Sequence, residues 1–306
     1  MKNTFQQEIF YVIKSKILIL SVIAALVFIG FSVVQGISTQ KSAVTLLKMG
    51  QKSDSNFQRD ITKNYHITID ANGDESISNS ARYDLEEVIK ADYQLTLFGF
   101  PQYVFKAYGL TLFYLMTGLL GIFLASYDYK YKTFKRRLES GTWKSIIASK
   151  FLSLTTLTLF IFMLTTVVAM LVGGVLSIIL KINPDYPNLV VAPSFMDVVH
   201  LAGIVWMITL FPSLACLAVT LAFKKSNVII ICFLVYHIMI PNLGKFDYTN
   251  SVLNIFSHFG QNLNIDMLPY IPISYPLSFI LMIGYCLAII LISLKVFYSY
   301  RRYRLD

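Results

Sequence analysis

Six long runs of uncharged, mostly apolar residues divide the chain. A transmembrane helix needs about 20 such residues to cross the roughly 30 Å hydrocarbon layer of a bilayer. We therefore expect an all-α polytopic membrane protein with six transmembrane helices. The expected spans are residues 17–35, 102–126, 150–180, 198–223, 227–243 and 273–297.

The distribution of basic residues predicts that both termini are cytoplasmic. If the N-terminus is inside, the segments on that side hold 16 of the 26 Lys and Arg residues but only 4 of the 17 acidic residues. Basic loops remain on the cytoplasmic side of a membrane. The same bias supports the fifth run, which Pro241 interrupts, because without it Arg301, Arg302 and Arg304 of the tail (298–306) would lie outside.

The composition excludes a soluble globular protein. Hydrophobic residues make up 56% of the chain and charged residues 14%, whereas soluble domains carry about 25% charged residues. The three cysteines lie inside apolar runs and are typical of small buried side chains. No small-residue cleavage site clearly follows the first run, so we expect a retained anchor, preceded by an amphipathic interfacial segment, residues 1–16.

Two segments are expected on the outer side. Residues 36–101 contain the pattern of a strand, an Asn-Gly turn and then a helix, which predicts a small α/β segment. Asp70, Asn72 and Asp74 resemble a calcium loop only superficially, because Gly73 is misplaced, and a hairpin turn is the preferred interpretation. Residues 244–272 predict either a short interfacial helix or an ordinary hydrophobic loop.

Candidate catalytic groups are absent from the central parts of the six runs, which contain no Asp, Glu, Lys or Arg. The chain has no Gly-rich phosphate loop ending in Gly-Lys-Ser/Thr and no His-Glu-x-x-His pair. His200 and His237 are isolated and are interpreted as structural. We therefore expect no enzyme activity, no metal and no nucleotide hydrolysis by this chain itself.

The most basic segment of the chain, residues 127–149, predicts a cytoplasmic helix. Tyr127, Tyr131, Phe134 and Leu138 recur at helical spacing, basic residues flank them, and Gly141 follows. Such a stripe can anchor at a lipid surface, or it can dock into a groove on a cytoplasmic partner. The composition alone favours the lipid interpretation.

The pattern from Asp128 to Lys150 resembles the segment after the second span in ABC transporter permeases of the ABC-2 type. The positions that agree are Asp128, Thr133, Leu138, Gly141, Ser149 and Lys150. The chain departs from the common family pattern by having Lys132 before Thr133, and Thr142-Trp143-Lys144 where a Ser-Arg pair is frequent. The expected six-span layout with both termini inside is also similar to that family.

The resemblance implies a permease subunit of a bacterial exporter in the plasma membrane, with an amphipathic or hydrophobic cargo such as a peptide, an antibiotic or a lipid. It implies a second permease, identical or homologous, and two cytoplasmic ATP-binding subunits that bind ATP and Mg. Resistance to antimicrobial peptides is the preferred role. The coupling helix that contacts the ATPase would comprise Tyr131, Phe134, Lys135, Arg136, Arg137, Leu138, Glu139 and Gly141.

A different class of function remains open from the sequence. The chain could be a membrane-anchored sensor, immunity or assembly protein whose outer segment, residues 36–101, binds a ligand without transport. Stimulation of a partner's ATPase activity would favour the permease.

Overall fold

Long α-helices make up most of the chain. The computed structural model describes residues 2–14, 16–53, 60–69, 75–131, 133, 142–182, 190–239, 242–260 and 270–302. Within these residues, five helices are long and apolar enough to cross a membrane, which indicates a multi-pass membrane protein. They cover Ile17–Lys52, Gly99–Lys130, Trp143–Ile179, Phe195–Phe223 and Tyr275–Ser299.

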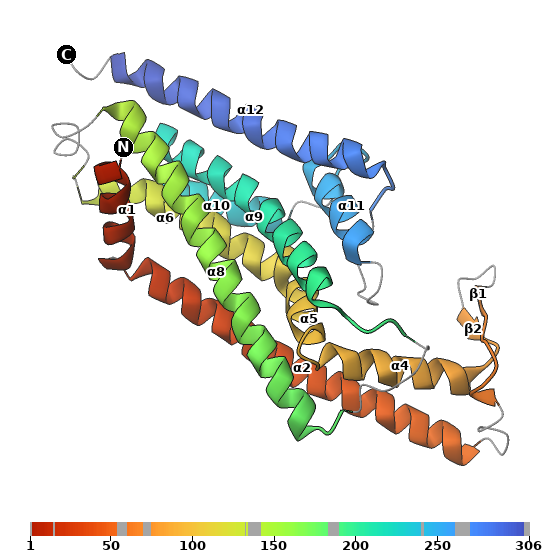
Figure 1. Ribbon diagram of the computed structural model, residues 1–306. Coiled ribbons are helices and arrows are strands. Elements are labelled where there is room, and N and C mark those ends of the chain that lie inside the picture. The colour runs from red at the N-terminus through yellow and green to blue at the C-terminus, as the bar shows by residue number, and fades with distance from the viewer. Residues whose placement is uncertain are drawn as a thin grey trace. The chain divides into compact units, whose positions relative to one another are not determined.

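The order of the elements follows the apolar runs (Figure 1). The helices are α1 (Lys2–Lys14), α2 (Ile17–Ser53), α4 (Ser80–Gln94), α5 (Gly99–Tyr108), the π-helix η1 (Gly109–Phe113), α6 (Tyr114–Lys130), α8 (Trp143–Ile179), α9 (Phe195–Phe223), α10 (Ser226–Met239), α11 (Tyr248–Gly260) and α12 (Tyr275–Arg302). The strands β1 (Ile67–Ile69) and β2 (Glu75–Ile77) are antiparallel, with Ile67 opposite Ile77.

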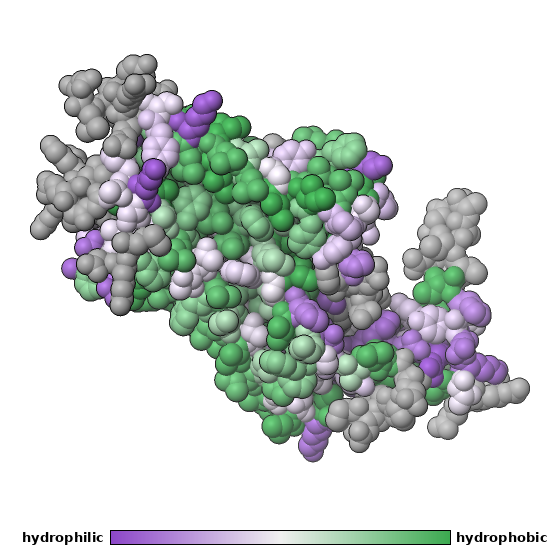
Figure 2. All heavy atoms as spheres, turned by 45° about the horizontal axis from the view of Figure 1, so that its top comes forward, coloured by the Kyte–Doolittle hydropathy of each residue, from purple (hydrophilic) through white to green (hydrophobic). Residues whose placement is uncertain are grey.

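The chain divides into two compact units, and each combines segments that are distant in sequence. The first comprises Met1–Phe28, Phe105–Thr165 and His200–Asp306, and the second Ile29–Val104 and Thr166–Val199. In the face shown in Figure 2, hydrophobic side chains cover the helices of the first unit, whereas hydrophilic ones gather around α4.

Close backbone contact holds α6 in the core of the first unit. A Cβ atom on Gly121 would lie 2.3 Å from the carbonyl oxygen of Ser213 in α9, so only glycine permits this approach. One turn away, the single proton of the Thr117 hydroxyl is shared between the carbonyl oxygens of Phe113, at 3.0 Å, and Thr209 of α9, at 3.3 Å. Small residues and hydroxyls of this kind are typical of helix contacts inside membranes.

A five-residue π-helix, η1, interrupts the second apolar helix between α5 and α6. Its first residue, Gly109, faces Val205 of α9, whose methyl carbon would lie 2.9 Å from an added Cβ. Phe113 at its other end is fully buried and packs edge-on against Phe28 and beside Phe162. The helix therefore widens where aromatic rings from three helices meet.

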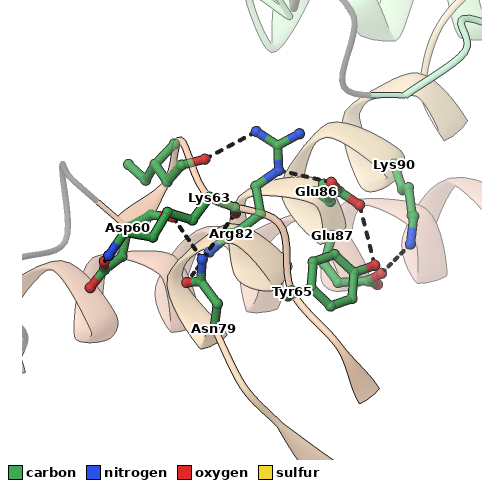
Figure 3. A network of polar contacts seen from close by, with 9 residues as sticks. Asp60, Lys63, Tyr65, Asn79, Arg82, Glu86, Glu87 and Lys90 are labelled. Atoms are coloured by element: carbon green, nitrogen blue, oxygen red, sulfur yellow. Dashed lines mark hydrogen bonds and ion pairs between the residues drawn. The ribbon is translucent and has the colours of Figure 1, made fainter.

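The second unit contains a polar network that ties the hairpin region to α4 (Figure 3). Arg82 donates to Glu86 Oε1 at 2.9 Å and to the carbonyl oxygen of Ile61 at 3.0 Å. Tyr65 donates to Glu86 Oε2 at 3.3 Å. Asn79 caps α4 by accepting from the Arg82 amide, and its own amide donates to the carbonyl oxygens of Asp60 and Lys63.

Three of the sequence-based expectations differ from the structure. The span expected over residues 17–35 is the first part of a longer helix, α2, which continues into the expected outer segment as far as Ser53. The fifth expected span, residues 227–243, contains α10, whose 14 residues extend only about 21 Å. The amphipathic segment expected over residues 1–16 contains α1, whose buried residues include the polar Thr4 and Glu8 beside Val12, whereas Ile13 is 53% exposed.

The segment between α10 and α12 forms a helix, α11, where the sequence left a helix and a loop open. Its apolar residues Val252 and Ile255 are buried in a cluster with Ile208 of α9 and Met282 of α12. The apolar face of α11 therefore packs against the helical bundle. Residues 70–74, which carry the predicted hairpin turn, lie outside the described residues.

Candidate functional site

The first unit buries a lysine with two carboxylates where three helices meet. Lys150, in the second turn of α8, lies 2.9 Å from Asp128 Oδ2 of α6 and 3.4 Å from Glu8 of α1, measured from its Nζ atom. The same ammonium group donates to the carbonyl oxygen of Leu124 at 2.9 Å. The Lys150 and Asp128 side chains are fully buried, and Glu8 is 2% exposed.

Asp128 also shapes the chain where α6 ends. Its second carboxylate oxygen accepts a hydrogen bond from the Thr133 hydroxyl at 2.7 Å. Its carbonyl oxygen accepts from the Thr133 amide at 3.0 Å. Because the helix ends at Lys130, the backbone bond satisfies a carbonyl that the helix terminus would leave open, and the side-chain bond holds Thr133 against the cluster. The direction in which the chain leaves the membrane helix is thus set by the buried cluster.

Hydrogen bonds also fix the backbone at Thr142, directly before α8 begins. The Thr142 hydroxyl accepts from the Ser145 amide at 3.3 Å, and its carbonyl accepts from Ile146, which is the geometry of a helix N-cap. Thr4 of α1 bonds to the Ser145 hydroxyl at 3.1 Å, and Trp143 packs edge-on against Phe297 of α12. Thr133 and Thr142 therefore bracket residues 134–141 with anchored backbone.

Figure 1 places α1, the end of α6, the start of α8 and the end of α12 at the same end of the first unit. The rings of Tyr11 and Tyr127 lie 5.3 Å apart, and Tyr127 and Tyr131 lie 4.7 Å apart. Lys130 lies 5.5 Å above the Tyr131 ring. This aromatic row runs from α1 to the C-terminal end of α6.

The electrostatics of the cluster make it a structural clamp. Two carboxylates and one ammonium group share a buried site, where removing the ammonium group leaves both carboxylates without a cation. Because α1, α6 and α8 each supply one charge, both ion pairs form only when the three helices meet in this arrangement. Separating α1 or α6 from α8 would therefore break an ion pair.

Most of the predicted coupling-helix residues lie outside the described part of the chain. These are Phe134, Lys135, Arg136, Arg137, Leu138, Glu139 and Gly141. Tyr131 is described; it caps α6 and is 55% exposed. Of the motif positions that carry the family resemblance, Asp128, Thr133 and Lys150 come together in one bonded group.

Sequence reasoning missed Glu8 as a site residue. It is the one acidic residue among three basic ones in residues 1–16, and that isolation on an otherwise basic segment is the signal that could have identified it. His237 stacks on Tyr114 at 4.5 Å, and His200 is exposed. No group of three or more potential metal ligands occurs among the residues that the structure describes.

Comparisons with known proteins found no relative that would identify the chain. No family model matches its sequence, no curated protein matches it, and no solved structure matches its fold.

Proposed function

We propose that this chain is the membrane-spanning permease subunit of an ATP-driven exporter that resembles the ABC-2 type. Two such permeases would pack together, with cytoplasmic ATP-binding subunits that supply ATP hydrolysis. The cargo would be an amphipathic or hydrophobic molecule taken from the membrane or the cytoplasm.

The observation that carries the proposal is the clamp of Glu8, Asp128 and Lys150 at the base of residues 134–141. A segment that receives force from a partner must be attached rigidly to the helices that the force has to move. Asp128 fixes the backbone before residue 134 through its bonds to Thr133. Lys150 lies about two helical turns after the N-cap at Thr142. Force applied to residues 134–141 would therefore pass into α6, α8 and α1 together.

The proposal includes six spans, with α10 as the short fifth span. At about 21 Å, α10 would cross only a thinned or locally wet part of the bilayer. Both termini would then lie on the cytoplasmic side, together with the clamp and the basic residues around it.

The test is association with an ATPase subunit encoded beside this chain. Replacing Phe134 and Leu138 together with Asp should abolish co-purification, because the apolar anchors of a helix-in-groove contact are lost. The matched control is Phe246→Asp, an exposed ring (58%) in the α10–α11 connection. Undiminished co-purification of the double variant, at normal membrane levels, would overturn the proposal.

A further inference from the structure

A cavity of about 640 Å³ lies within the first unit, away from the charged clamp. Its walls come from α9, α10 and α12, and the start of α11 closes one end. Along α10 the lining residues are Val228, Ile229, Cys232, Phe233 and Tyr236, which share one helical face, and Lys225 lines the cavity just before the helix begins. The volume falls within the roughly 300–1,000 Å³ of small-molecule sites.

The α11 end of this cavity combines aromatic rings with a carboxylate. Four tyrosines line the cavity, Tyr114, Tyr236, Tyr248 and Tyr285, and the carboxylate is that of Asp247. The remaining lining is aliphatic apart from three thiols, Lys225 and the rings of Phe223 and Phe233. Aromatic faces beside a carboxylate attract an organic cation, and the apolar walls favour a hydrophobic body.

Asp247 has no ion-pair partner in the part of the chain that the structure describes. Its Oδ2 atom accepts one hydrogen bond, from the Leu243 amide at 3.2 Å. The neighbouring Lys245 lies over the ring of Phe246, 5.9 Å from the ring centre. The carboxylate therefore keeps acceptor capacity, and no basic side chain among the described residues forms an ion pair with it.

A second observation points to a ligand in the same place. The Tyr248 hydroxyl oxygen is buried and lacks a hydrogen-bond partner of acceptable geometry among the described residues, although the Tyr114 hydroxyl and the Cys286 thiol are near. Buried polar groups in native proteins are almost always satisfied. A bound molecule, or a water that accompanies it, would complete this bond.

We propose that this cavity binds a hydrophobic organic cation, with its charge between Asp247 and the tyrosine faces and its apolar body along α10. Lys225 lines the opposite end, three helical turns or about 16 Å from Tyr236, so its charge does not oppose binding at the α11 end. Binding requires only this chain; the assignment of the cation as transported cargo rests on the proposed function.

The probes are tetraphenylphosphonium and tetraphenylborate, which share shape and hydrophobicity but have opposite charges. Equilibrium dialysis would measure their binding to the full chain in zwitterionic lipid nanodiscs, with empty nanodiscs subtracted. Tetraphenylphosphonium should bind at least about tenfold more tightly than tetraphenylborate. Equal binding of the two would show an apolar groove without charge selection and would overturn the proposal.

Variants locate the site. Asp247→Asn keeps an oxygen that can accept from Leu243 and should weaken cation binding about tenfold or more. Tyr236→Leu should weaken it about three- to tenfold, whereas Tyr236→Phe keeps the aromatic face and should change it less than twofold. Asp197→Asn, at the start of α9 and outside the cavity lining, is the control. Unchanged binding in both Asp247→Asn and Tyr236→Leu would overturn the proposal.

A last measurement distinguishes a failure of the cation site from a failure of the proposed function. With the ATPase subunits present, tetraphenylphosphonium should raise the rate of ATP hydrolysis, and Asp247→Asn should reduce that response. If binding is charge-selective but the rate of ATP hydrolysis does not change, the cation site is supported and its role as a cargo site is rejected. A response that survives Asp247→Asn would place the cargo elsewhere and overturn this assignment.

Discussion

The charge of Lys150 is the single feature on which the clamp depends. Its ammonium group lies between two carboxylates and a carbonyl oxygen, with no exposed surface. The partners of a buried lysine stabilise its charge. The complete ion-pair cluster nevertheless adds little to the free energy of unfolding compared with apolar residues in its place. We infer that it is retained because it specifies how α1, α6 and α8 meet.

Replacing Lys150 with Met should therefore reduce the free energy of unfolding by about 3–5 kcal/mol, because two carboxylates are left buried without a cation. Thermal unfolding of the purified protein in detergent would show the loss as a lowered Tm. Lys144→Met, an exposed lysine in the same helix, should leave Tm unchanged.

A triple variant provides the complementary test. Combining Lys150→Met with Glu8→Gln and Asp128→Asn removes the uncompensated charges and should recover part of the stability lost in the single variant. The alternative outcome is that Glu8→Gln and Asp128→Asn lower the stability of Lys150→Met further, by the sum of what each costs as a single variant. In that case the three groups do not act as one cluster.

The contact between helices α6 and α9 depends on one glycine, Gly121. Gly121→Ala would place a methyl group against the Ser213 carbonyl, and the helices would have to separate. We expect a loss of about 1–3 kcal/mol, measured by thermal unfolding. Gly284→Ala in α12 is the matched control, since nothing lies within 4 Å of its added Cβ. An equal effect of the two substitutions would contradict the close approach.

The cap of α4 gives a prediction for the second unit. Asn79→Ala removes the acceptor of the Arg82 amide and both donors to the Asp60 and Lys63 carbonyls. We expect the first turn of α4 to lose about 1–2 kcal/mol of protection, measured by amide hydrogen exchange. Ser80→Ala, the next residue, should leave this protection within a few tenths of a kcal/mol. Undiminished protection in Asn79→Ala would show that the cap is dispensable.

Helices were predictable from the sequence wherever apolar runs were long, because length and hydrophobicity alone demand them. The extension of α2 to Ser53 was not, since Gln40, Lys41 and Lys48 interrupt the apolar pattern and a helix over 36–53 must be stabilised by neighbours. Gly36 and Gln40 contact Leu95 and Asp92 near the end of α4. Such support is tertiary, and it leaves no local signature.

The clamp was half predictable. Asp128, Thr133 and Lys150 were identified as a pattern in the chain, but their physical role required the structure, because Lys150 and Asp128 meet only when α6 and α8 lie side by side. Glu8 is 142 positions from Lys150. No periodicity relates residues so far apart, and only packing of α1 against α8 brings them together.

At the scale of the whole molecule, the number of spans decides where the C-terminus lies. Five spans would place the termini on opposite sides of the membrane, and six would place them on the same side. We expect reporter fusions at both termini to show cytoplasmic activity, which requires that α10 crosses the bilayer. A C-terminal reporter that is active only outside would make α10 an interfacial or re-entrant helix and would contradict the proposed topology.

The central claim is that residues 134–141 pass the force of a partner ATPase into the clamped helices. The most direct measurement is ATP hydrolysis by purified ATPase subunits reconstituted with this chain in proteoliposomes. The chain should raise the hydrolysis rate, and Leu138→Asp should abolish that increase while leaving membrane insertion intact. An ATPase rate that does not respond to this chain, or that responds equally to Leu138→Asp, would contradict the account.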